Sequence, residues 1–72
     1  MFHFLENSSH MQNHIAEWRK RRRMRQAQLA HALGVDPYRI SQWEHGVYLP
    51  RIDVILEMAR VLDCRVEDLF SL

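Results

Sequence analysis

The sequence predicts an all-α domain built from four to five short helices. From Ile15 to Phe70, apolar residues recur at the three- and four-residue spacing of amphipathic helices. Residue types that begin or end helices stand between these stretches, and no stretch shows the apolar–polar alternation of a half-buried strand. At 72 residues the chain has the length of one domain. We therefore expect an N-terminal tail at residues 1–12 and a helical domain at residues 13–72.

The tail has no clear hydrophobic period and is rich in Asn, Ser and His, so we expect it to be flexible. Its tripeptide Ser9-His10-Met11 also resembles a joint left by an expression vector. The first helix should follow at once, with Asn13 as its cap and Glu17 in its first turn, where a carboxylate suits the helix dipole. Ile15 and Trp18 mark its buried side, and the run Arg19–Arg23 should continue the helix with its charges outward.

A second helix is predicted over Gln26–Leu33. Leu29, Ala30 and Leu33 form a narrow apolar stripe along it, and the small Ala30 allows another helix to cross closely. Gly34 stands where a left-handed residue commonly ends a helix, because glycine adopts positive φ without a steric penalty.

The third helix is predicted over Pro37–Glu44. Asp36 can cap it, and proline suits the first helical position, because its missing N–H has no partner there. Ile40 and Trp43 should face inward, and Gly46 should again be left-handed. The residues left at the outer face or its rim are Tyr38, Arg39, Ser41 and Gln42.

A fourth helix is predicted over about Arg51–Leu62, and a last turn over Val66–Phe70. The residues expected on one apolar face of the fourth helix are Ile52, Ile55, Leu56, Ala59 and Leu62. Apolar residues at the end of the chain exceed what so small a core needs. We therefore expect a dimer surface at this helix and the chain end, which includes Leu69, Phe70 and Leu72.

The net charge of +1 conceals two halves of opposite sign. Residues 15–51 hold eight Lys and Arg and three Asp and Glu, a balance of +5. Residues 52–72 hold two basic and five acidic residues, a balance of −3. This asymmetry suggests one face for a polyanion such as nucleic acid, and another face turned away from it.

Two short helices joined by a tight turn with glycine, the second of them capped and amphipathic, describe a helix-turn-helix. The stretch from Ile15 to Phe70 resembles the phage repressor and Cro-like family, also called XRE-like, whose domains have the lambda-repressor-like fold. The matching residues are Ile15, Trp18-Arg19, Gln26, Leu29-Ala30, Leu33-Gly34-Val35, Ile40, Trp43-Glu44, Gly46, Pro50, Ala59, Leu62 and Asp68-Leu69-Phe70. They cover about three quarters of the chain in unbroken register.

The resemblance implies that the third helix reads DNA bases and that its surroundings hold the phosphates. The expected base-reading residues are Tyr38, Ser41 and Gln42, and a glutamine can pair with both hydrogen-bonding groups of an adenine edge. The expected backbone contacts are Gln26, Arg22, Arg23, Arg25, Arg39, His45, Val47 and Tyr48, with the loop His45–Tyr48 acting through its N–H groups. The resemblance also implies an internal ion pair between Arg19 and Glu44.

The chain departs from the family pattern at three positions. Arg25 and Arg65 replace the usual capping Ser, Thr or Asp, so we expect the second helix to begin loosely and the last turn to be weak. Pro37 occupies a position where some members place a polar residue that contacts bases. Fewer side chains are therefore expected to read bases here.

The resemblance implies a sequence-specific regulator of transcription, a repressor that acts as a homodimer by occupying an operator. Two alternatives remain open: the antitoxin of a toxin–antitoxin pair, and a protein-interaction module on the same scaffold. No set of nucleophile, base and orienting group stands out, so we do not expect an enzyme.

We expect neither a metal nor another cofactor, since His10 and His14 have no third ligand nearby. A single cysteine, Cys64, excludes an intrachain disulfide and suits a reducing compartment. We see no membrane span or signal peptide, so the expected location is the cytoplasm, at the nucleoid.

Overall fold

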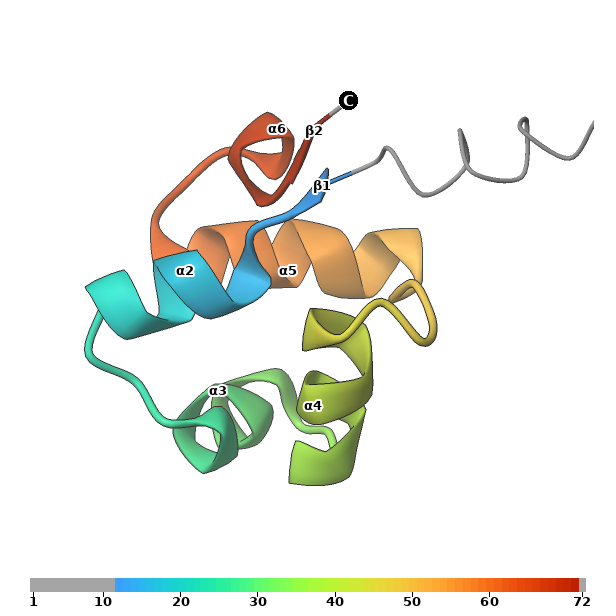
Figure 1. Ribbon diagram of the computed structural model, residues 1–72. Coiled ribbons are helices and arrows are strands. Elements are labelled where there is room, and N and C mark those ends of the chain that lie inside the picture. The colour runs from blue at the N-terminus through green and yellow to red at the C-terminus, as the bar shows by residue number, and fades with distance from the viewer. Residues whose placement is uncertain (1–11, 72) are drawn as a thin grey trace, which may run out of the picture.

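Five helices and one short strand pair make up residues 12–71, the part of the chain that the computed structural model describes (Figure 1). The elements are β1 (Gln12–Asn13), α2 (Ile15–Arg21), α3 (Gln26–Leu33), α4 (Pro37–Glu44), α5 (Ile52–Leu62), α6 (Val66–Leu69) and β2 (Phe70–Ser71). The predicted all-α class is confirmed, with a minimal sheet added. The prediction of a flexible tail concerns residues 1–12, and residues 1–11 lie outside the described part.

Helix α5 crosses the middle of the molecule and separates two layers (Figure 1). Helices α3 and α4 pack against each other on one side, and α6 and the strand pair lie on the other. Helix α2 lies beside α5 and contacts α4. The buried apolar core contains Ile15, Leu29, Ala30, Ile40, Trp43, Met58, Ala59, Leu62 and Leu69. Because every helix contributes to this one core, α4 has a firm support on its inner side.

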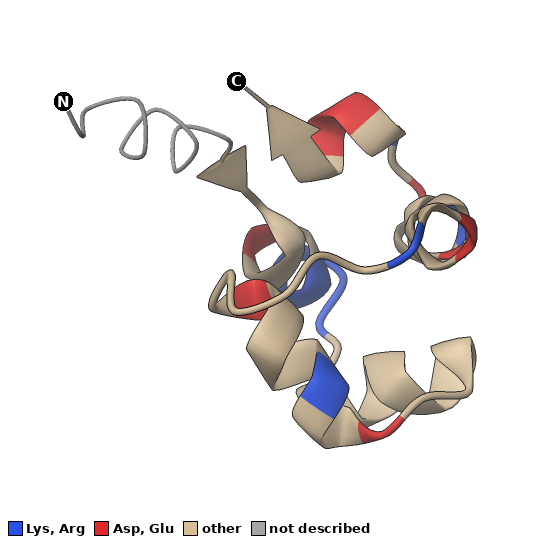
Figure 2. Ribbon diagram, turned by 90° about the vertical axis from the view of Figure 1, so that its right-hand side faces the viewer, with Lys and Arg blue, Asp and Glu red and all other residues tan. Residues whose placement is uncertain are grey.

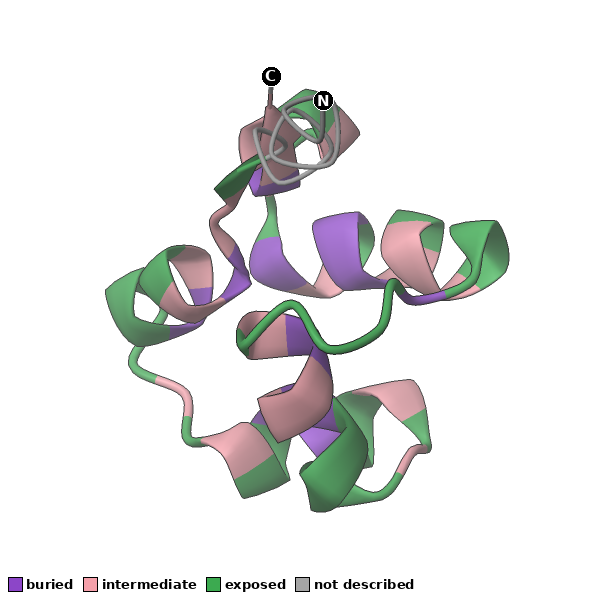
Figure 3. Ribbon diagram, turned by 45° about the vertical axis from the view of Figure 1, so that its right-hand side comes forward, coloured by how far each residue is buried: buried purple, intermediate pink, exposed green. Residues whose placement is uncertain are grey.

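The predicted apolar face of α5 is wrong at two positions. Ile52 and Leu56 are 66% and 56% exposed, whereas Met58, which the prediction omitted, is fully buried. Figure 3 shows exposed residues along the beginning of this helix. No described element packs over that side of the first turns, so the buried face is confined to the later residues.

Helix α2 ends two residues earlier than predicted, because Arg23 adopts a left-handed conformation with φ 59°. The chain turns there, and the N–H of Met24 bonds to the carbonyl of Arg19 at 3.0 Å. The turn directs Arg22 onto the end of α5, where its guanidinium donates to the carbonyls of Leu62 (2.7 Å) and Asp63 (2.9 Å). A cation at this end also suits the helix dipole.

The helix starts partly follow the predicted capping. Asp36 caps α4 as expected, its Oδ1 accepting the N–H of Tyr38 at 2.8 Å. Arginine has no acceptor, so neither Arg25 nor Arg65 caps its helix with its side chain. Gln28 accepts the N–H of Arg25 at 2.7 Å, and Asp68 accepts the N–H of Arg65 at 2.9 Å. In each pair the side chain at the third helical position accepts the N–H of the N-cap residue, which is one of the two hydrogen bonds of a capping box.

The strand pair joins the two ends of the described chain, which the sequence did not predict. Gln12 pairs with Ser71 and Asn13 with Phe70, in antiparallel register. The backbone N–H of His14 donates to the carbonyl of Leu69 at 2.8 Å. Leu69 is fully buried and so cannot belong to the predicted dimer surface, whereas Phe70 is half-buried and Leu72 lies outside the described residues.

Asn13 connects this strand pair to two helices. His14 takes the N-cap position that was predicted for Asn13, but the Asn13 Oδ1 still accepts the N–H of Ile15 at 3.0 Å. The Asn13 Nδ2 donates to the carbonyl of Trp43 near the end of α4. One amide therefore holds the start of α2 and the end of α4 together.

Replacing Asn13 by alanine should lower the free energy of unfolding by about 1–2 kcal/mol, because it removes a helix-start acceptor and one of the two donors to the Trp43 carbonyl. In a domain of this size each kcal/mol lost lowers Tm by about 4–8 °C. Thermal unfolding followed by circular dichroism measures the shift. Gln12→Ala, at an exposed position of the same strand, is the control, and equal Tm values for the two variants would contradict the connection.

Among residues 12–71 we find no helix with both the length and the apolar character needed to cross a membrane.

Candidate nucleic-acid interface

The outer face of α4 carries the residues predicted to read bases. Tyr38 is 69% exposed, whereas Ser41 and Gln42 are half-buried at the rim. The opposite face of the helix is fixed in the core by Ile40 and Trp43. The major groove of B-DNA admits an α-helix, so a capped helix supported from behind and polar in front has suitable dimensions for it.

The end of α4 is held by His45. The Nδ1 of this imidazole lies 2.7 Å from the carbonyl oxygen of Ser41, so it carries the hydrogen and donates. The imidazole therefore has only Nε2 left for an outside ligand.

An ion pair joins Arg19 and Glu44, the residues for which the resemblance implied one. The Arg19 Nε and Nη2 donate to the two carboxylate oxygens of Glu44 at 2.5 and 3.1 Å. The two side chains are only 10% and 5% exposed. The Arg19 Nη1 donates to the carbonyl of Met24 at 2.9 Å, so the guanidinium is bonded on several sides. This pair connects α2 directly to the last residue of α4.

Gln26 belongs to the same network. Its Nε2 donates to the Glu44 Oε1 at 2.9 Å, which fixes the first residue of α3 against the end of α4. An amide nitrogen has two hydrogens, so one remains for an outside acceptor such as a phosphate. The network thus sets the position of the α3 start relative to the outer face of α4.

The arginines of the basic run are placed in different ways. Arg22 caps α5, and the guanidinium of Arg21 lies 4.3 Å from the centre of the Trp18 ring, a cation–π contact. Arg23 and Arg25 are exposed just before α3. In residues 12–71 neither of these two guanidinium groups forms an ion pair, which leaves them suited to phosphates. Of the three predicted backbone contacts between α2 and α3, Arg22 is therefore the one already engaged inside the fold.

Acidic residues gather away from α3 and α4. Figure 2 shows the acidic part of α6 at the end of the molecule opposite this helix pair. Within α4 the one carboxylate, Glu44, is paired with Arg19, and in the turn before it the exposed Asp36 caps the helix. Asp36 is therefore the carboxylate that a polyanion meets at the α3–α4 turn.

The loop after α4 has its backbone donors largely engaged. The N–H groups of His45, Gly46 and Val47 bond to the carbonyls of Ser41, Trp43 and Gln42 at 2.9–3.1 Å. The prediction that His45 and Val47 offer backbone N–H groups to phosphate is therefore wrong, because the helix end already uses them. Tyr48 is 62% exposed and keeps its hydroxyl for an outside partner.

The shifted pKa values belong to residues away from α4. A hydrogen bond from Arg60 lowers the pKa of the Glu57 carboxyl, and burial raises the pKa of the Cys64 thiol. Cys64 packs against the core, and a raised pKa keeps its thiol protonated.

Comparisons with known proteins agree with this geometry. Residues 15–69 match the helix-turn-helix family model HTH_3. Two proteins of Archaeoglobus fulgidus, each named an uncharacterized HTH-type transcriptional regulator, are 38% and 35% identical to this chain over 60 residues. The matches cover 83% of this chain and 86% and 84% of the two relatives.

Proposed function

The chain belongs to the helix-turn-helix family HTH_3, and we propose that it represses transcription by occupying an operator that α4 reads in duplex DNA. Family membership and the names of the relatives support a DNA-binding regulator of transcription. The observation that carries the finer proposal is the outer face of α4, held by the Arg19–Glu44–Gln26 network. Such a repressor acts in the cytoplasm, at the nucleoid.

Each part of the face has a role in this proposal. Gln42 reads an adenine edge, and Tyr38 and Ser41 contact neighbouring bases. Gln26 binds a phosphate with its second amide hydrogen and so sets the register of α4. The exposed arginines Arg23, Arg25 and Arg39 and the Tyr48 side chain would contact the backbone on either side.

The repressor acts as a homodimer in this proposal, because one eight-residue helix reads only a few base pairs. Three exposed apolar side chains offer the contact: Leu49, Ile52 and Leu56, which we call the apolar patch. Ile52 and Leu56 are one helical turn apart and so share one side of α5. Two copies joined through this patch bury it by two-fold symmetry and present two α4 helices to half-sites about 34 Å apart.

The first experiment is the selection of bound duplexes from a randomised DNA library, with the winners measured again over a series of salt concentrations. A motif with two-fold symmetry is the expected result, and its spacing gives the geometry of the dimer. Binding without an enriched motif, but with steep salt dependence, would mean contact with the DNA backbone alone. That outcome would overturn the repressor proposal in favour of a protein-interaction role.

Gln42→Ala and Gln26→Ala should weaken binding in different ways. Gln42→Ala should cost about 1–3 kcal/mol at the preferred site and relax the preference at one base pair. Gln26→Ala should weaken all sequences alike, because it removes a phosphate contact. Competition binding with the selected site and its single-base variants separates the two patterns. An unchanged base preference in Gln42→Ala would show that the proposed register of α4 is wrong.

A further inference from the structure

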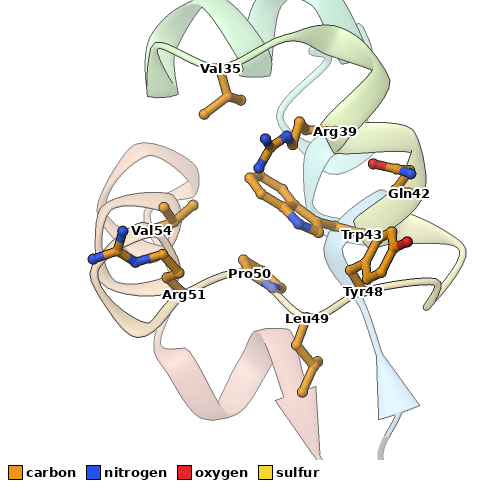
Figure 4. Close-up of a pocket in the computed structure, with 9 residues that line it drawn as sticks. All are labelled: Val35, Arg39, Gln42, Trp43, Tyr48, Leu49, Pro50, Arg51 and Val54. Carbon is orange, nitrogen blue, oxygen red and sulfur yellow. The ribbon is translucent and has the colours of Figure 1, made fainter.

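A groove of about 450 Å³ lies between α4, the loop that follows it and the start of α5 (Figure 4). Its volume falls in the range of sites that bind small molecules in proteins. The lining residues are Val35, Arg39, Gln42, Trp43, Tyr48, Leu49, Pro50, Arg51 and Val54.

The groove combines an apolar floor with two cationic walls. Trp43 and Pro50 are buried, and Val35 and Val54 are half-buried beside them. Arg39 reaches along the Trp43 indole from α4, and Arg51 comes from the start of α5 with its guanidinium turned outward, on the far side of Val54 from Trp43 (Figure 4). Asp and Glu do not occur among the lining residues, and the carboxylate of Asp53 lies beside Arg51 at the edge of the groove.

Neither arginine is strongly engaged within residues 12–71. No hydrogen bond or ion pair of the described residues involves the Arg39 guanidinium. The Arg51 Nε lies 3.5 Å from the Asp53 Oδ1, but these side chains are 86% and 65% exposed. An exposed pair of this kind contributes little stability, so it competes weakly with a ligand.

We propose that this groove binds a small organic carboxylate with an apolar body, and that its binding releases DNA. The carboxylate pairs with Arg39, and the exposed Arg51 side chain turns toward it as a second planar donor. The apolar body covers Val35, Val54 and the exposed edge of Trp43, which gains the free energy of burying apolar surface. A phosphate of DNA can satisfy the arginines but has no apolar group for this floor.

The release of DNA rests on the proposed function, because Arg39 and Gln42 lie on α4 and line the groove together. A carboxylate bound to Arg39 neutralises the positive charge that would contact the DNA backbone. The apolar body of the same ligand lies beside Gln42, the side chain proposed to read a base. Carboxylate and operator therefore compete for the same residues, and the protein acts as a repressor that a metabolite of this class inactivates.

The binding test uses the tryptophan in the groove as its reporter. The chain has two tryptophans, so Trp18→Phe leaves Trp43 as the only one. Octanoate is the probe. Acetate has the charge without the apolar body, and 1-octanol has the body without the charge. We expect a saturable change of Trp43 fluorescence with octanoate, and none with acetate or 1-octanol at the same concentrations.

Matched variants in the Trp18→Phe background locate the site. Arg39→Gln and Arg51→Gln should each weaken octanoate binding about tenfold or more, because each removes a charged hydrogen bond. Val54→Phe, which fills the floor, should abolish binding. Arg60→Gln, an exposed arginine of α5 outside the groove, should bind as the parent does. The proposed site would be overturned if neither Arg39→Gln nor Arg51→Gln changed the affinity for octanoate. It would also be overturned if octanoate and acetate changed the Trp43 fluorescence equally.

A second measurement tests the release of DNA by the native chain. Octanoate should displace a labelled selected duplex over the concentrations that saturate Trp43. Saturation without displacement would overturn the release but leave the binding site standing. A failure of the proposed function looks different: the chain then has no preferred duplex even without octanoate, while the fluorescence titration still decides the site.

Discussion

Glu44→Ala is expected to lower the free energy of unfolding by about 3–5 kcal/mol, because it leaves the guanidinium of Arg19 buried without its carboxylate. Gln26 loses its acceptor in the same variant. The total stability of small domains is about 5–15 kcal/mol, so the variant should be near the limit of folding at 25 °C. Urea unfolding followed by circular dichroism measures the loss.

The control for this variant is Glu57→Ala. Glu57 pairs with Arg60 at the surface of α5, where an ion pair contributes about 0–1 kcal/mol. A double variant adds a second test, since replacing both Arg19 and Glu44 by Met and Leu removes the stranded charge and should recover much of the loss. If Glu44→Ala unfolds at the same midpoint urea concentration as the native chain, the buried pair does not hold α2 and α4 together.

Leu56→Glu is expected to convert the proposed dimer into monomers and to lower affinity for a two-half-site operator by about 10²–10⁴-fold. The reason is that the second half-site then has to be bound by an independent copy. The fold should be unaffected, because Leu56 is exposed in the described chain. Sedimentation equilibrium gives the oligomeric state, and titration of an operator duplex gives the affinity.

A duplex with one half-site is the control for the added charge. Leu56→Glu should bind it as the native chain does, because one copy needs no partner. Leu56→Ser, which removes the apolar side chain without a charge, should show the same pattern to a lesser degree. Native chain that sediments as a monomer at concentrations that saturate the operator would contradict the dimer. A copurifying protein bound at the apolar patch would favour the antitoxin alternative.

The helix-turn-helix was readable from the sequence because local signals define it. Gly34, with φ 72°, ends α3, and Asp36 with Pro37 begins α4, so both helices were predicted with the bounds that the structure has. These signals act within a few residues, so the neighbouring sequence is enough to interpret them. The buried sides of α3 and α4 followed from the same periodicity.

The parts that the sequence left hidden depend on partners far along the chain. Arg22 was expected to contact the DNA backbone, and only the path of the turn at Arg23 brings it onto Leu62, 40 residues away. The strand pair was missed because two residues per strand are too few to show alternation. For the candidate site, the sequence supplied the outer residues of α4, but the groove beside Arg51 needed the relative placement of α4 and α5.

The strand pair also bears on the order of events in folding. It joins residues 12–13 to residues 70–71, so almost the whole described chain has to be closed into a loop before it forms. Helix contacts between neighbours in sequence form sooner, and distant pairings of this kind come late. Asn13 then bonds the Trp43 carbonyl, so the contact made last is one that secures the end of α4. Native-state hydrogen exchange should accordingly find the two chain ends opening together, in a partial unfolding that breaks the Asn13 bond to α4 while the core, including Ile40 and Trp43, persists.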